Sequence, residues 1–444
     1  MFSYPESVKK IIDLLLSNGF KAYLAGGCVR DSIMGVAPHD YDVATSALPE
    51  QMMNVFSDYK VIPTGIKHGT LTVVADGLPV EVTTFRTDGK YTDNRRPDSV
   101  SFTASFEDDA KRRDFTVNAM GYNEYEGLLD YFGGKKDIEN KIIRCVGNPD
   151  ERFCEDALRI LRALRFSSLL GFAIESKTAS SAIKNRTLIN NISAERIREE
   201  FVKLLCGKKA GDVLSEYSRI VTTIIPEAAC MIGFQQHTPY HIYDVWEHTL
   251  KAVDSILPEV PLRLAAFFHD IGKPGTFSCD ENGVGHFYGH AAKSCAIAES
   301  VMKRLKFDKC TENRVLRIIK YHDLQIANTP NAVKKCMNKI SEETFFDLIN
   351  MFRADNAAQA PMCRYRIKHY DAIEKTARDI IEEKSCFSLA SLDIDGDDLI
   401  NLGIPRGKKI GAILNNLLEL VMNEKLENEK KILIDYVVQN MDRL

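Results

Sequence analysis

Two glycines and two aspartates near the N-terminus have the spacing of a site for phosphate chemistry. Gly26 and Gly27 follow a short apolar run, and they let the backbone approach a triphosphate and point N–H groups at it. If Asp40 and Asp42 alternate on a strand, both carboxylates share one face and can hold divalent cations for nucleotidyl transfer. Glu81, between two valines in another strand-like run, is a candidate third acid. A lone D-x-D is usually a surface turn, but this combination favours a functional site.

A second cluster lies at residues 155–166, where EDALR is followed by ILRALRF. The apolar period predicts one continuous helix, with Arg159 and Arg162 on its polar face and Asp156 at the margin of that face. Arg165 falls in the apolar arc, so it must reach around or line a second surface. An Asp beside an Arg offers acceptors and donors in one plane, which can imitate the pairing edge of a nucleobase. The alternative is an ordinary amphipathic helix with i,i+4 ion pairs.

Seven of the ten histidines lie between His237 and His322. Neutral imidazoles together with carboxylates suit a transition metal. The alternative is a helical spacer that has lost its metal. Within this segment, three histidines are given no role and are expected to be packing or surface residues: His237, His241 and His286.

The motifs GGCVRD, DYD and RRDFTVNAM (residues 112–120) resemble those of class II tRNA nucleotidyltransferases, the CCA-adding enzymes and bacterial poly(A) polymerases of the DNA polymerase beta-like superfamily. The resemblance implies that Asp40 and Asp42 bind Mg²⁺. It further implies that CTP and ATP are the substrates, that tRNA is the partner, and that EDALR selects the nucleotide. The nucleotide-binding residues implied in this way are Gly27, Arg30, Arg113, Asp156, Arg159, Arg162 and Arg165.

Two further segments bear on which branch of that family the chain resembles. Residues 61–74 are more similar to the CCA-adding branch than to the poly(A) polymerase branch. The family's flexible loop, used to switch from C to A addition, is matched by Arg86, Asp88, Tyr91, Asp93 and Arg95-Arg96-Pro97. The match favours complete CCA addition. The alternatives are a poly(A) polymerase, a C-only or A-only enzyme, and an RNA-end phosphohydrolase whose head only binds RNA.

The order H…HD…D in the histidine-rich segment resembles HD-domain metal-dependent phosphohydrolases. That resemblance implies a minimal metal site made of His248, His269, Asp270 and Asp323. His290 and His322 would allow a second metal.

The whole chain agrees with such a protein. Its 444 residues are 45% hydrophobic with a net charge of −4, which excludes a globally basic nucleic-acid binder but allows a local basic surface. Scattered cysteines and the lack of a long apolar run favour a cytoplasmic protein outside the membrane. The oligomeric state is left open. We expect an α+β fold: a nucleotidyltransferase head with a small sheet (1–145), an all-α neck (146–236), an HD module (237–330), and a helical tRNA-binding body and tail (331–444).

Overall fold

The computed structural model describes residues 4–89 and 99–440, and the chain divides into two compact units, 1–226 and 227–444. Each unit is described by itself. The boundary between the units lies close to the predicted end of the neck. The finer division into four parts remains a prediction.

Among the described residues of the first unit, seven strands form one mixed sheet. In spatial order they are β3 (Lys60–Gly65), β4 (Thr70–Ala75), β5 (Leu78–Thr84), β2 (Asp42–Thr45), β1 (Ala22–Ala25), β8 (Gly121–Asn123) and β9 (Gly127–Leu129). The pair β2–β5 is parallel, and its register sets Asp42 directly opposite Glu81. The sheet therefore brings the candidate third acid beside Asp42.

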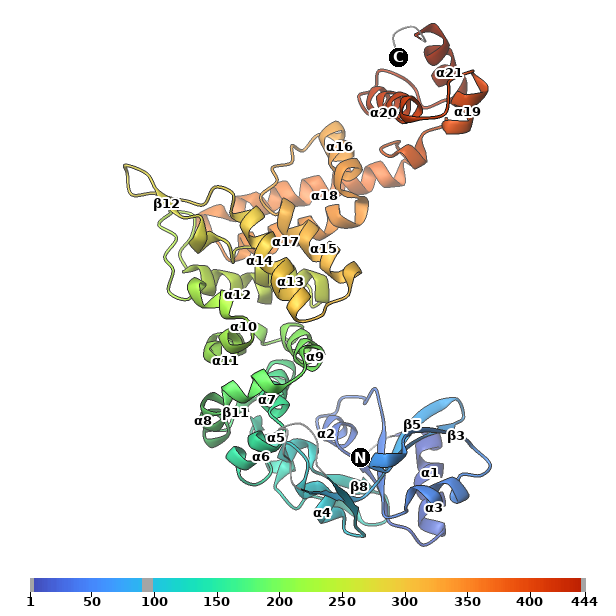
Figure 1. The fold of residues 1–444 in the computed structure, drawn as a ribbon, viewed down its shortest axis with the longest axis vertical. Coiled ribbons are helices and arrows are strands. Elements are labelled where there is room, and N and C mark those ends of the chain that lie inside the picture. Colours follow the sequence, from blue (N-terminus) through green and yellow to red (C-terminus); the bar gives the residue numbers. More distant parts are fainter. Residues whose placement is uncertain (1–3, 90–98, 441–444) are drawn as a thin grey trace. The chain divides into compact units, whose positions relative to one another are not determined.

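Helices and aromatic side chains fix the sheet that carries these acids. Helix α1 (Glu6–Ser17) buries one apolar stripe and packs on β1 and β4, with α3 (Pro49–Val55) beside it (Figure 1). The rings of Tyr23, Phe85 and Phe106 meet with centroids 5.1–6.1 Å apart. Phe106 begins α4 (Phe106–Lys111), so this aromatic cluster anchors the helix that leads to Arg112 and Arg113.

The rest of the first unit is mainly helical. Its elements are α2 (Gly27–Ile33), β6 (Arg86–Asp88), β7 (Val100–Phe102), α5 (Gly134–Glu139), β10 (Ile142–Ile143), α6 (Pro149–Glu155), α7 (Leu158–Leu170), β11 (Ala173–Ile174), α8 (Ser176–Lys184), α9 (Ala194–Leu205), α10 (Ala210–Glu216) and α11 (Ser218–Ile224). Helix α7 packs along α9 and is buried over most of its length.

The predicted continuous helix through EDALR is wrong at one position. Helix α6 ends at Glu155, Asp156 is extended (φ −136°, ψ 102°), and α7 begins at Leu158. The Asp156 carboxylate accepts a hydrogen bond from the Leu158 N–H at 3.1 Å. This local bond competes with the helical bonding of the backbone, as short Asp side chains often do. The residue thus stands at a break between two helices.

In the second unit the described elements are almost all helices. They are α12 (Val245–Ser255), α13 (Val260–Phe268), α14 (His290–Arg304), α15 (Lys309–Tyr321), α16 (Pro330–Ile340), α17 (Glu342–Ala357), α18 (Arg366–Glu382), α19 (Gly396–Asn401), α20 (Lys408–Met422) and α21 (Lys430–Gln439), with one short hairpin of β12 (Ser278–Cys279) and β13 (Gly285–His286). Helix α17 packs on α12, α13 and α15 although it lies beyond the predicted module boundary at 330. Helices α19, α20 and α21 share a separate apolar core and lie together at the red end of the chain (Figure 1). Within the described parts, no helix is long and apolar enough to cross a membrane.

Candidate functional site

A cavity of about 460 Å³ in the first unit gathers most of the residues that the sequence singled out. Of the predicted nucleotide-binding and metal-binding residues, those lining it are Gly27, Arg30, Asp42, Arg113, Asp156, Arg159, Arg162 and Arg165. Arg112, Asp114, Asn118 and Phe166 also line it. Six guanidinium groups around one cavity create a strongly positive site, which suits a triphosphate.

The acidic side of this site centres on Asp42. Strand β2 begins at Asp42, so Asp40 lies in the bend before the strand, and the expected alternation of the two residues along one strand is wrong. Partial burial, together with the negative charges of Glu81 and Asp40, raises the pKa of the Asp42 carboxyl to about 6 against the opposing effect of Arg113. The three carboxylates therefore repel one another and favour a bound cation.

Gly26 makes room between the acid and an arginine. Its φ of 81° is a left-handed conformation that favours glycine. A Cβ atom there would lie 3.1 Å from Arg113 Nη1 and 3.8 Å from Asp42 Oδ2. Arg30, on the helix that starts at the next residue, donates to the Asn118 side-chain oxygen at 2.7 Å. The glycine pair thus lets cationic and anionic groups approach the same small volume.

Buried carboxylates hold the arginines of the cavity. Asp109 accepts hydrogen bonds from Arg112 Nε at 2.9 Å and from Arg113 Nη2 at 3.1 Å. Glu200, on α9, accepts one from Arg165 Nη1 at 3.0 Å. Burial alone would raise the pKa of Asp109, but the two guanidinium groups outweigh it and lower that pKa. These acids orient the arginines before any ligand arrives.

Asp114 does the same for Arg162. Its Oδ2 accepts from Arg162 Nε at 2.7 Å, and its Oδ1 accepts from the Phe115 N–H at 2.8 Å. Burial would raise the pKa of Asp114, yet the charges of Arg162 and Arg159 lower it below its ordinary value. The carboxylate is therefore ionised at neutral pH.

Phe166 explains how Arg165 reaches the cavity from the apolar arc of α7. The guanidinium carbon of Arg165 lies 4.3 Å from the centre of the Phe166 ring, and those of Arg30 and Arg162 lie 5.4 Å from it. One aromatic ring thus supports three cations, an arrangement in which ring and guanidinium groups attract each other.

The predicted base-selecting pair is also held by neighbours. Asp156 Oδ2 forms an ion pair with Arg196 Nη2 of α9 at 3.0 Å. Arg159 Nη1 contacts Glu155 Oε2 at 2.6 Å, and its Nη2 donates to the Arg112 carbonyl oxygen at 3.0 Å. Both side chains are therefore fixed from outside the cavity while lining it.

The predicted flexible loop is only partly within the described residues. Arg86 and Asp88 form β6, which pairs with β7, and Arg86 Nη1 donates to the His68 carbonyl oxygen at 2.7 Å. The remaining members lie outside the described residues: Tyr91, Asp93, Arg95, Arg96 and Pro97.

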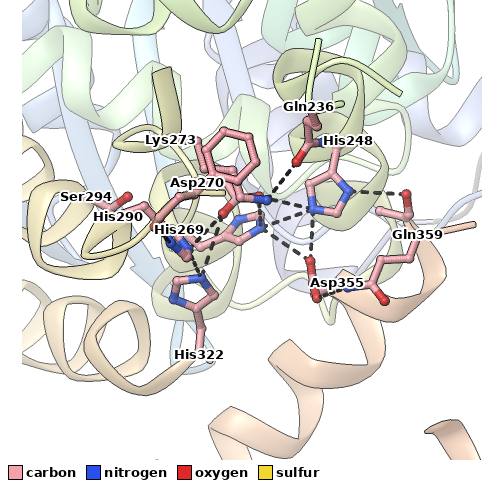
Figure 2. Close-up of polar contacts among 12 residues, drawn as sticks. Gln236, His248, His269, Asp270, Lys273, His290, Ser294, His322, Asp355 and Gln359 are labelled. Carbon is pink, nitrogen blue, oxygen red and sulfur yellow. Dashed lines mark hydrogen bonds and ion pairs between the residues drawn. The ribbon is translucent and has the colours of Figure 1, made fainter. Parts of the chain in front are cut away.

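The second unit contains a cluster of histidines and carboxylates, here called the histidine centre. One ligand group comprises His248, His269, Asp270 and Asp355, and a second comprises Asp270, His290 and His322. They come from α12, the end of α13, α14, the end of α15 and α17, and Figure 2 shows their polar atoms converging. His248 Nε2 lies 2.9 Å from Asp355 Oδ1 and 3.3 Å from Asp270 Oδ2.

The predicted fourth ligand of the first group is corrected by this geometry. Asp355, not Asp323, completes the group with His248 and His269. Asp323 is 60% exposed and lies 3.2 Å from His290 Nε2, on the side of the second group. Asp355 has no histidine beside it in the sequence and lies on α17, beyond the histidine-rich segment. No local signal in the sequence marks it as a ligand.

The imidazole rings of the histidine centre have the orientation that a metal requires. The Nδ1 atoms of His248, His269, His290 and His322 lie 2.7–3.2 Å from backbone carbonyl oxygens. A carbonyl only accepts, so in the neutral ring Nδ1 carries the proton and Nε2 presents a lone pair to the centre. Two Nε2 atoms then face each other at 3.3 Å, and another two at 3.0 Å. A cation between them would relieve this repulsion, so the residues fit a bound metal.

The charge of the histidine centre also fits a bound metal. Burial would raise the pKa of Asp270, but the positive charge of His269, when its ring is protonated, and that of Lys273 hold it well below its ordinary value. Lys273 Nζ lies 2.7 Å from Asp270 Oδ2. An ionised carboxylate shared by both ligand groups can bridge two cations.

Several residues of these sites were not predicted as functional from the sequence. Asp109, Asp114, Glu200 and Arg196 are charged residues in or near helices, where solvent exposure is the ordinary expectation. Only Asp114 had a signal, since it stands inside the RRDFTVNAM motif.

Successive parts of the chain match models of known protein families. Residues 22–144 match the family model of the poly A polymerase head domain, 171–229 that of an RNA and SrmB-binding site of polymerase A, and 289–437 that of tRNA nucleotidyltransferase domain 2. A CCA-adding enzyme of Lactobacillus helveticus is 34% identical over 96% of this chain and 95% of its own. One of Geobacillus kaustophilus is 50% identical over 47% of this chain and 51% of its own. The crystal structure of the Bacillus stearothermophilus CCA-adding enzyme in complex with CTP superimposes with a TM-score of 0.76 at 29% identity, covering 99% of this chain and 98% of that one.

The ion pair of Asp114 yields a prediction about stability. Asp114→Asn removes the nearest counter-charge of the partly buried Arg162, leaving Glu200 at 3.8 Å, and should lower the free energy of unfolding by about 3 kcal/mol at pH 7. Because the folded pKa of Asp114 is lowered, its contribution is complete above the unfolded value of about 3.9 and is lost as pH falls through the folded value. The loss caused by the substitution should therefore be constant above about pH 5 and shrink below it.

Urea unfolding of the full chain, followed by circular dichroism, measures this difference. Trp246 is the only tryptophan and lies in the second unit, so its fluorescence identifies the transition that belongs to that unit. Asp58→Asn, at an exposed position of the first unit, is the control and should change stability by less than about 0.5 kcal/mol. A deficit in Asp114→Asn that grows toward low pH would contradict the assignment.

Proposed function

This chain belongs to the CCA-adding enzyme family, and we propose that it adds C, C and A to the 3′ end of tRNA from CTP and ATP without a nucleic-acid template. The carrying observation is the cavity of the first unit, which combines six arginines, the carboxylate of Asp42 and the Asp156–Arg159 pair. A relative 34% identical over nearly its whole length supports complete CCA addition.

In this reaction the terminal 3′-hydroxyl oxygen of the tRNA attacks the α-phosphorus of the nucleoside triphosphate. A new O–P bond forms, the bond from the α-phosphorus to the bridging oxygen breaks, pyrophosphate leaves with that electron pair, and the hydroxyl proton passes to solvent. Mg²⁺ bound by Asp40 and Asp42, with Glu81 beside them, would offset negative charge on the reacting oxygens. Arg30, Arg113 and Gly27 would hold the triphosphate in place.

Base choice would rest on Asp156 and Arg159. The helix break places the Asp156 carboxylate at the cavity, and the rigid planar guanidinium of Arg159 offers donors beside it. Their outer contacts, Arg196 for the acid and Glu155 for the arginine, limit the positions that either side chain can take. Arg162 and Arg165, fixed by Asp114 and Glu200, would complete the nucleotide-binding wall.

The proposed reaction predicts a specific pattern of incorporation. With tRNA that ends before CCA, CTP alone should give two added residues, ATP alone should give none, and both together should give three. Asp42→Ala should lower both incorporations by about 1,000-fold or more, because the cations lose a ligand, while tRNA affinity in a filter-binding assay stays unchanged. Long A tails would favour a poly(A) polymerase, and a stop after C or a requirement for preadded C would favour a partial enzyme.

A separate experiment tests the base-selecting pair. Asp156→Asn keeps the shape of the side chain but replaces an acceptor with a donor, and Arg159→Lys keeps the charge but removes the planar fork. Each should reduce the preference for CTP and ATP over UTP and GTP by about 10- to 100-fold, measured as ratios of kcat/KM. Lys184→Ala, at an exposed position of α8, is the control. An unchanged preference in both variants, or an equal loss with all four nucleotides, would count against a protein template.

For the second unit we propose an HD-type metal site with phosphohydrolase activity. The support is the ring orientation of the four histidines and the shared Asp270 carboxylate. A transition metal bound by His248, His269, Asp270 and Asp355 would supply Lewis acidity toward a phosphoryl oxygen. His290 and His322 would add ligands for a second ion.

Metal analysis of the purified full chain tests this second proposal. Wild type should carry one or two ions and hydrolyse bis(p-nitrophenyl) phosphate, and His269→Ala and Asp355→Ala should lose at least one ion and this activity, with CCA incorporation retained. Asp323→Ala should keep the ion of the first ligand group. His369→Ala, in the same unit, is the control. Wild-type protein without metal, or unchanged hydrolysis in His269→Ala, would refute the HD site.

A further inference from the structure

A second cavity, of about 490 Å³, opens beside the histidine centre, and the proposals above do not say which organic group would fill the part of it away from the metal ligands. Asp270, His290, His322 and Asp355 line one part of it, and the β12–β13 hairpin with the residues after it lines another. We propose that this cavity binds a phosphorylated nucleoside, with its base stacked on the paired rings of His286 and Tyr288 and its phosphate toward the histidine centre. The phosphate part of this inference rests on the proposed metal site.

The hairpin that carries the ring pair is fixed to the unit. Ser278 pairs with His286 and Cys279 with Gly285. The Gly285 N–H donates to the His237 carbonyl oxygen at 2.8 Å, and a Cβ atom at Gly285 would lie only 2.3 Å from the Gln236 carbonyl oxygen. The base of the hairpin therefore packs backbone against backbone, which only a glycine permits.

The two rings of the pair are parallel, and that of Tyr288 is accessible. Those of His286 and Tyr288 are stacked, with centroids 5.4 Å apart and an interplanar angle of 7°. A contact of 3.1 Å from His286 Nε2 to Asp280 Oδ2 sets the orientation of the imidazole. Tyr288 is nevertheless 80% exposed, so the pair is not held by burial in a core. Exposed, preoriented aromatic rings are the feature on which single nucleobases stack.

The phosphate end of the cavity is marked by a buried cation. The Lys273 side chain is almost fully buried, and its Nζ donates to Gln236 Oε1 at 2.8 Å while pairing with Asp270 at 2.7 Å. Lys273 lines the same cavity as the ring pair. Figure 2 shows Lys273 beside Asp270 and Gln236. An ammonium group beside the metal ions that these ligands would hold would form a site for a phosphate group.

The ring pair and the histidine centre are close together in the sequence. Tyr288 and the ligand His290 are separated only by Gly289, which has a φ of 79° and precedes the first turn of α14. The Cα atoms of Tyr288 and His290 are therefore at most about 7 Å apart. A base on the ring pair and a phosphate at the histidine centre thus lie within the reach of one nucleotide.

The test compares two ligands that differ only in the base. Adenosine 5′-monophosphate and ribose 5-phosphate are bound to the full-length, Mn²⁺-loaded protein in equilibrium dialysis. All variants carry Asp156→Ala and Arg159→Ala, so binding by the first unit is weakened and equal throughout. Tyr288→Leu and His286→Ala should weaken binding of adenosine monophosphate about tenfold and leave ribose 5-phosphate unchanged, because only the base stacks. Tyr288→Phe should retain the affinity for adenosine monophosphate of the protein that carries only the two first-unit substitutions. Tyr125→Leu, at an exposed tyrosine of the first unit, should have no effect on that affinity.

The outcomes separate this inference from the hydrolase proposal. The base-binding role is overturned if the variants weaken adenosine monophosphate and ribose 5-phosphate equally, or if Tyr288→Leu changes neither affinity. This holds even if bis(p-nitrophenyl) phosphate is hydrolysed in a His269-dependent manner. Binding of adenosine monophosphate that requires Tyr288 would support the cavity as a nucleotide site. If the protein then hydrolyses neither adenosine monophosphate nor bis(p-nitrophenyl) phosphate, the hydrolase proposal is refuted. Competition by a trinucleotide ending in a 3′-phosphate distinguishes the sources: tighter binding than the free nucleotide identifies an RNA end, and weaker binding identifies a free nucleotide.

Discussion

Guanidinium groups repel one another, and six of them line one cavity of the first unit. They can be gathered there in the free protein because buried carboxylates neutralise and orient them. Asp109 holds Arg112 and Arg113, Asp114 holds Arg162, and Glu200 holds Arg165. Asp109 lies one helical turn before Arg112 and Arg113, whereas the packing of α7 on α9 brings Glu200 to Arg165. The positive surface for a triphosphate is thus present before the ligand, which reduces the cost of ordering these side chains on binding.

The histidine centre applies the same principle to neutral groups. Backbone carbonyls orient its rings at Nδ1, and the buried carboxylate of Asp270 is shared between the two ligand groups. In both units the residues that would contact a ligand are positioned by other groups of the protein. For partners that do not line the cavity, such as Asp109 and Glu200, a substitution should therefore alter chemistry without touching a substrate.

What the sequence predicted correctly is local along the chain. The apolar run before Gly26, which forms β1, and the strand-like run around Glu81, which forms β5, each lie within a few consecutive residues, and the small sheet followed by helices is confirmed. The nucleotide-site residues were found because they stand in compact motifs. Asp355 and Glu200 were missed because their partners lie far away in the sequence: His248 is on α12, and Arg165 is on α7. The break at Asp156 was missed because a side-chain bond to the Leu158 N–H overrides a strong helical pattern.

That break has a consequence for how such a site can change during evolution. Glu155, Asp156 and Arg159 lie within five consecutive residues, at the joint of α6 and α7, whereas Asp42 and Glu81 lie on separate strands of the sheet. Under the proposed roles, nucleotide choice and catalytic power are encoded in different segments of the gene. Substitutions within one short segment can therefore change which nucleotides are added, while the residues that catalyse their addition stay the same.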